Sequence, residues 1–142
     1  METCIPQPGT GVQLEALSVW TMWRLQFRDF GTHQSLVTDH TVNNGQGVAA
    51  VRWYELRRSS GGSPWTIFQQ GTHSPDGTSR WMASAAINKA GTLALGYSVS
   101  SISTFPSIRF AARLASDPPG TMGVEVNLIA GGGMQTFNFP AR

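Results

Sequence analysis

Three arginines, two tyrosines and two carboxylates come closest to a catalytic set in this chain. A retaining glycosidase needs two carboxyl groups flanking the sugar, or a tyrosine nucleophile with an acid partner. The residues available for those roles are Tyr54, Tyr97, Glu55 and Asp76. If the substrate is an acidic sugar, arginines also hold its carboxylate through paired hydrogen bonds. The arginines available for this are Arg52, Arg80 and Arg109.

The adjacent aromatic residues Trp53 and Tyr54 suggest a second kind of site, a platform on which a sugar ring stacks. Successive side chains of a strand point to opposite faces of the sheet, so at least one of the two is expected in the core. We assign no catalytic residue. The candidate ligand-binding residues are Arg52, Trp53, Tyr54, Arg80, Tyr97 and Arg109.

The histidines and the single cysteine, Cys4, give little support for a metal site. A zinc site needs three or four converging ligands, and repetition of Gly-Thr-His accounts for both His33 and His73. Asp39 and His40 would make an acid–base pair, but neighbouring strand residues point to opposite faces. We therefore predict no metal and no cofactor.

The charge pattern argues against a nucleic-acid partner. Charged residues make up 13% of the chain, against about 25% in typical soluble domains. Nucleic-acid binding favours a clustered basic face, whereas Arg57-Arg58 is the only adjacent basic pair. No apolar run is long enough to span a membrane, and the first residues (METCIPQPGT) lack the pattern of a signal peptide. We expect neither a nucleic acid nor a membrane as partner.

Short runs of β-forming residues, separated by turn signals, predict an all-β, antiparallel chain. With 142 residues the chain is long enough for one domain with a core. The turn NNGQG at 43–47 is a strong hairpin signal. Residues 1–23 form an N-terminal arm or lead-in, in which 13–23 is either a short helix or irregular. We expect strands at 24–30, 36–42, 48–57, 65–70, 81–88, 92–100, 107–114 and 124–130.

Internal similarities indicate repeats. Segment 65–80 aligns without a gap with segment 127–142. Segment 36–55 is similar to segment 81–99, with Trp53 matching Tyr97, and this leaves 107–114 as an extra strand. Sheets of about four antiparallel strands, repeated every ~40–50 residues, are typical of β-propeller blades. We expect about two blade-like repeats, 24–80 and 81–142, with a β-sandwich as the alternative.

Several stretches resemble a family of large, mostly uncharacterised bacterial secreted proteins with a sialidase-like, BNR-like β-propeller. They are RWYELR (52–57), QQGTHSPDGTSRWMAS (69–84), LALGYSVSS (93–101), FPSIRFAARLASDPPGTM (105–122) and IAGGGMQT (129–136). Segment 74–81 also partly resembles the Asp-box S-x-D-x-G-x-T-W, normally a fold-stabilising turn, with Arg80 replacing Thr. The resemblance implies an extracellular protein, and it implies that the chain is a fragment of a longer propeller.

A propeller site is assembled from most of its blades, so about two blades are too few to build one. We expect a non-catalytic propeller piece that acts structurally or binds carbohydrate or protein. The alternative is a sialidase-type glycoside hydrolase, active only when the propeller is completed. Uncovered sheet faces and edges promote association. The expected partners are therefore further copies of the chain, or the remainder of a larger propeller, and a carbohydrate.

Overall fold

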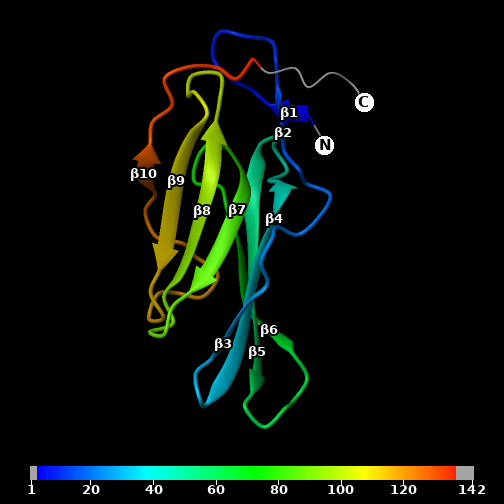
Figure 1. Ribbon diagram of the computed structural model, residues 1–142, viewed down its shortest axis with the longest axis vertical. Helices are drawn as coiled ribbons and strands as arrows, with labels where there is room; N and C mark the ends of the chain where they lie inside the picture. Colours follow the sequence, from blue (N-terminus) through cyan, green and yellow to red (C-terminus); the bar gives the residue numbers. More distant parts are fainter. Residues whose placement is uncertain (1–2, 137–142) are drawn as a thin grey trace.

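Two four-stranded antiparallel sheets form the body of the computed structural model, which describes residues 3–136 (Figure 1). Sheet 1 contains β3 (Gln26–Asp29), β4 (His33–Asn43), β5 (Ala49–Ser59) and β6 (Thr66–His73). Sheet 2 contains β7 (Ser79–Ile87), β8 (Leu93–Ser100), β9 (Ser107–Arg113) and β10 (Val126–Ile129). Within each of these sheets every strand pairs with the next along the chain, so both are up-and-down meanders. The all-β, antiparallel prediction is confirmed, and each expected strand is present.

The N-terminal arm forms a small sheet of its own, in which β1 (Thr3–Ile5) pairs with β2 (Leu14–Glu15). Residues 13–23 contain no helix, so the helical alternative for this segment is wrong. The apolar residues of the arm serve tertiary contacts instead. Ile5 and Ala16 are fully buried beside Ala49 of β5 and Trp81 of β7, which attaches the arm to both sheets.

The same kind of asparagine turn closes the β4–β5 hairpin of sheet 1 and the β7–β8 hairpin of sheet 2. The Asn44 side-chain oxygen accepts hydrogen bonds from the backbone N–H groups of Gln46 (2.9 Å) and Val48 (3.3 Å). The Asn88 oxygen accepts from those of Ala90 (2.9 Å) and Thr92 (3.0 Å) in the same way. Such local bonds are why asparagine favours turns. The shared turn explains why segments 36–55 and 81–99 look alike.

The positions of the strands in the two sheets disagree with one of the two sequence alignments, that of segment 36–55 with segment 81–99. β4 and β7 are alike in sequence, yet β4 lies second in sheet 1 and β7 lies first in sheet 2. Residues 107–114 are no extra strand, because each sheet has four strands and β9 lies third, as β5 does. β6 and β10, in contrast, both lie last in their sheets. The expected boundary after residue 80 falls within β7.

The core lies between the inner faces of the two sheets. Strand alternation directs Val37 of β4 with Val51 and Trp53 of β5 toward sheet 2, where they join a buried cluster containing Ala83 and Ala85 of β7. Burial of each large apolar side chain contributes roughly 1.5–3 kcal/mol. In Figure 1 the two sheets lie beside each other, and the lower ends of β3, β5 and β6 extend past sheet 2.

Side chains of sheet 1 cover the free edge of β7. The Ile87 N–H donates to the Gln26 side-chain oxygen at 2.6 Å, and the Ile87 carbonyl accepts from Arg28 Nε at 2.8 Å. Asp39 and Thr41 of β4 accept hydrogen bonds from other backbone N–H groups of β7. An uncovered edge is a template for pairing with other chains, so these bonds protect β7 and join the two sheets.

The outer faces of the two sheets differ in side-chain size. A row of large apolar residues crosses all four strands of sheet 1, at Phe27, Leu36, Leu56 and Ile67. Small residues cross three strands of sheet 2, at Ala86, Ala94 and Ala112. Sheet 1 therefore presents bulky apolar side chains outward, whereas this part of sheet 2 is smooth.

Candidate functional site

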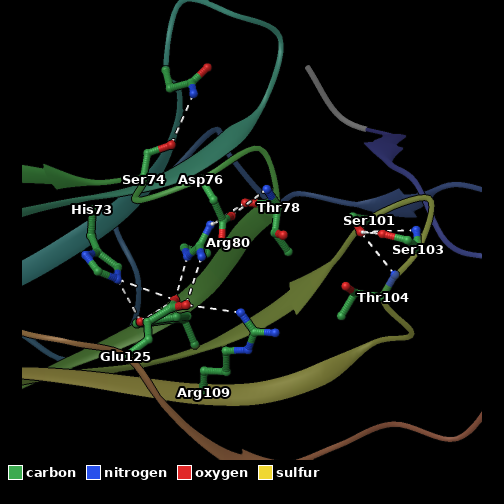
Figure 2. A network of polar contacts seen from close by, with 12 residues as sticks. His73, Ser74, Asp76, Thr78, Arg80, Ser101, Ser103, Thr104, Arg109 and Glu125 are labelled. Atoms are coloured by element: carbon green, nitrogen blue, oxygen red, sulfur yellow. Dashed lines mark hydrogen bonds and ion pairs between the residues drawn. The ribbon is translucent and has the colours of Figure 1, made fainter.

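A cluster of polar side chains gathers where β6, β7, β8 and β9 meet the segment before β10 (Figure 2). We call it the Arg80 cluster, and it contains His73, Asp76, Arg80, Tyr97, Arg109 and Glu125. Arg80 is 0% exposed near the start of β7. Its Nε donates to Glu125 Oε1 at 2.6 Å and its Nη2 to Oε2 at 2.8 Å. This paired geometry fixes the orientation of both groups.

A close backbone crossing positions Glu125. After β9, residues 114–125 pass over β6, where a Cβ added to Gly71 would lie 2.2 Å from the Gly120 carbonyl oxygen. The Gly120 N–H donates to the Gln69 side-chain oxygen at 3.3 Å, and the Gly123 N–H donates to the Ala112 carbonyl at 3.0 Å. Glycine permits this approach because it has no side chain, and the crossing delivers Glu125 to Arg80.

The Asp-box-like segment forms the turn between β6 and β7. Asp76 Oδ1 accepts a hydrogen bond from the Thr78 N–H at 2.7 Å and another from Arg80 Nη1 at 2.9 Å. The Ser74 hydroxyl accepts from the Asn44 side-chain amide at 3.1 Å, and Trp81 is buried. These contacts support the fold-stabilising role expected for the segment.

Tyr97 and His73 complete the inner side of the cluster. The Tyr97 hydroxyl donates to Glu125 Oε1 at 2.7 Å, so His73 Nε2–H is the donor in the 2.8 Å contact with the Tyr97 oxygen. Burial lowers the pKa of His73, although Glu125 lies nearby and opposes this. Burial also raises the pKa of Tyr97, and the bond to Glu125 raises it further. At neutral pH both groups are therefore uncharged.

The two carboxylates stay ionised. Burial alone would raise the pKa of Glu125, but hydrogen bonds from Arg80 and Tyr97 lower it to about 2. The hydrogen bond from Arg80 also lowers the pKa of Asp76 to about 2. Arg80 stays protonated because its bonds to these carboxylates raise its pKa despite burial. A general acid or base needs a pKa near the working pH, so neither carboxylate is tuned for that role.

The structure brings together three of the six candidate ligand-binding residues. Arg80, Tyr97 and Arg109 all contact Glu125, the last through an Nη1–Oε2 bond of 3.1 Å. The other three, which are consecutive in β5, divide between the faces of sheet 1. Trp53 is buried in the core. Arg52 and Tyr54 lie on the outer face, with the guanidinium 5.4 Å from the ring centroid.

The expectations for Trp53-Tyr54 and for Asp39-His40 are confirmed. In each pair one residue points inward and the other outward. Asp39 is 1% exposed, whereas the His40 ring lies 5.6 Å from that of Tyr54 on the outer face. Burial raises the pKa of Asp39 to about 6, despite a hydrogen bond from the Ala85 N–H. Asp39 and His40 therefore do not act together.

Sequence reasoning missed Glu125 and the burial of Glu55. Glu125 follows a Pro/Gly-rich loop, and only the need of buried Arg80 for a counter-charge could have pointed to it. Glu55 is buried in β5, where it accepts bonds from Ser35 (2.8 Å), Gln69 (2.6 Å) and Arg57 (2.6 Å). The strand alternation that buries Trp53 also buries Glu55. The Glu55 carboxylate, like that of Glu125, is therefore occupied by hydrogen bonds within the protein.

One surface hollow lies outside these clusters, and another borders the Arg80 cluster at Arg109 and Glu125. The first, which we call the tryptophan groove, has a volume of about 1150 Å³ between the lead-in and sheet 1, and Trp20, Trp23, Leu25, Thr38 and Leu56 line it. Trp23 is 87% exposed. The second, which we call the Arg109 pocket, has a volume of about 480 Å³, and Ser103, Thr104, Phe105, Arg109, Glu125 and Asn127 line it.

In residues 3–136, no three His, Cys, Asp or Glu side chains gather closely enough to hold a metal ion. The same part of the chain has no helix with the length and apolar character needed to cross a membrane. Comparison with known protein families, with curated proteins and with solved structures finds no match. The likeness to sialidase-like propeller proteins therefore stays a prediction.

Proposed function

We propose that this protein is a non-catalytic, blade-like β module whose outer sheet faces bind further copies of the chain. The observation that carries the proposal is the difference in side-chain size between one row of residues on the outer face of sheet 1 and one row on the outer face of sheet 2. Phe27 and Ile67 on sheet 1 are 51% and 54% exposed, whereas Ala86, Ala94 and Ala112 make a smooth row on sheet 2. Exposed apolar patches mark interaction surfaces.

The contact inside the chain is the template for the contact between chains. The inner face of sheet 1 places Val37, Val51 and Trp53 against a β7 strand that carries Ala83 and Ala85. The outer faces offer the same combination as this part of the core, with bulky residues on sheet 1 and alanines on sheet 2, although β8 also brings Leu93, Leu95 and Val99 to the inner face. A second copy that lays its sheet 2 on the outer face of sheet 1 repeats this packing, and the tryptophan groove lies beside that face.

Such an interface joins two different surfaces, so it is heterologous. It closes into a ring if the rotation between copies allows, and otherwise extends as an open stack. About three chains would supply about six blades for a ring. The remainder of a larger propeller would cover the same faces in the same way.

The strand connections favour blades over a β-sandwich. Sandwiches of the immunoglobulin type use Greek-key connections in which strands pass between the two sheets. Here β3–β6 form one meander and β7–β10 the next, with a single crossing between them. Each meander has the four strands of a propeller blade.

The non-catalytic part of the proposal rests on the state of the Arg80 cluster. A tyrosine nucleophile must reach the substrate, but Tyr97 is buried and bonded to Glu125. The Arg80 guanidinium is already paired with Glu125 and Asp76, so it is not free to bind a substrate carboxylate. We expect no turnover of chromogenic glycosides. Turnover that Tyr97→Phe abolishes would support the alternative, a sialidase-type hydrolase that works in a completed propeller.

Two variants test the heterologous interface. Ile67→Asp damages the outer face of sheet 1, and Ala86→Arg damages that of sheet 2; both side chains are exposed, so the fold should survive. Each variant alone is expected to be a monomer in light scattering. Because each keeps one intact face, mixing them should give a one-to-one dimer. No dimer on mixing, with circular dichroism unchanged, would contradict the proposed pairing. The extracellular setting remains a further prediction.

A further inference from the structure

The Arg109 pocket has the size and the rigid walls of a small-molecule site. Its volume of about 480 Å³ lies within the range of ~300–1,000 Å³ typical of ligand pockets. The Ser101 hydroxyl accepts hydrogen bonds from the N–H groups of Ser103 (3.2 Å) and Thr104 (3.0 Å), which fixes one wall (Figure 2). The Gly131 N–H donates to the Ser107 hydroxyl at 2.9 Å, which fixes the other. A preformed pocket needs little ordering when a ligand binds.

The pocket presents donors and acceptors close together. Asn127 of β10 lies opposite Arg109 of β9 in the strand register, so both side chains share one face. Arg109 is 24% exposed and donates one N–H to Glu125, while a guanidinium carries five N–H donors. The Asn127 amide and the Thr104 hydroxyl can each donate and accept. This mixture matches neighbouring hydroxyl groups, which also donate and accept.

The charges around the pocket balance. Arg80 and Arg109 carry two positive charges, and Asp76 and Glu125 carry two negative ones, all linked by ion pairs. A ligand carboxylate would meet Glu125 and would have to displace it from Arg109. A like charge close by disfavours an anion, so the pocket suits a neutral ligand.

We propose that the Arg109 pocket binds one residue of a neutral sugar, with hydroxyl groups on Arg109, Asn127 and Thr104 and the apolar face of the ring on Phe105. The site is distinct from the outer faces that bind further copies, and it does not depend on their association. The protein then holds a carbohydrate at each copy and gains avidity from assembly.

The test is nuclear magnetic resonance titration of the whole chain with the methyl glycosides of glucose, galactose, mannose and N-acetylglucosamine, and with glucuronic acid as the acidic probe. Backbone amide shifts should change at residues 103–109 and 125–131 with at least one neutral probe. Asn127→Ala and Thr104→Val should each lower the affinity for that probe roughly threefold to tenfold, as expected for one lost hydrogen bond. Gln46→Ala, on the distant 44–48 turn, is the matched control and should bind as wild type.

Four outcomes would overturn the proposal. They are no shift changes with any probe, shift changes centred on the tryptophan groove, tighter binding of glucuronic acid than of every neutral probe, and unchanged affinity in both pocket variants. Light scattering of Asn127→Ala separates the two proposals, because this variant should assemble as wild type does.

Discussion

Arg80 and Glu125 meet through two hydrogen bonds, of 2.6 and 2.8 Å (Figure 2). They meet although Arg80 belongs to one edge strand of sheet 2 and Glu125 lies next to the other. Arg80 lies near the start of β7, and Glu125 lies just before β10. Desolvation offsets much of the attraction in a buried pair, but removal of one partner leaves an unpaired buried charge. The pair therefore specifies where the 114–125 segment crosses the fold.

Glu125→Gln should destabilise the protein by about 3 kcal/mol, at the low end for a broken buried pair because Asp76 still faces Arg80. Urea unfolding at neutral pH measures this, and Glu15→Gln is the matched control because the Glu15 side chain is exposed. Folding lowers the pKa of Glu125 from 4.5 to about 2, so its contribution is present above pH 4.5 and is lost as the pH falls toward 2. Equal stability of the two variants would contradict the structural role.

Asp39→Asn should change how stability depends on pH. Folding raises the pKa of Asp39 from 3.8 to about 6, so its contribution is present below pH 3.8 and is lost as the pH rises through 6. Between about pH 4 and pH 8, wild type should lose about 2.5 kcal/mol of unfolding free energy relative to Asp39→Asn. The test compares slopes from urea unfolding at several pH values. If the unfolding free energies of wild type and Asp39→Asn change in parallel with pH, Asp39 titrates normally.

Gln26→Ala should expose the edge of β7. The Ile87 N–H would lose its acceptor, and an unpaired buried donor costs about 1–3 kcal/mol. Hydrogen exchange at the Ile87 amide should become faster than in wild type, while Gln46→Ala leaves it unchanged. An unchanged Ile87 amide in Gln26→Ala would mean that the side chain does not cover this edge.

Much of the fold follows from local sequence rules. Alternation predicted that at least one of Trp53 and Tyr54 lies in the core, where the structure places Trp53, and the NNGQG signal marked the turn at Asn44. The expectation that 107–114 is an extra strand is wrong for an equally local reason. Asn44 and Asn88 form the same turn, so the stretches around them look alike even though β4 and β7 occupy different places in their sheets.

The site depends on contacts that local patterns do not record. Arg80, Tyr97 and Arg109 were all candidates, but their common partner Glu125 lies beyond a loop whose path depends on the approach of Gly71 to Gly120. The covering of β7 by Gln26 likewise joins residues far apart in the chain. Such bonds exist only once the sheets are stacked, so residue type and spacing could not reveal them.

Light scattering of the wild-type chain across micromolar concentrations tests the central claim most directly. If the bulky outer face of sheet 1 binds the smooth face of sheet 2 on another copy, the measured mass should be a multiple of the chain mass. The mass should fall to that of one chain in Ile67→Asp. A wild-type protein that stays monomeric throughout would contradict the account.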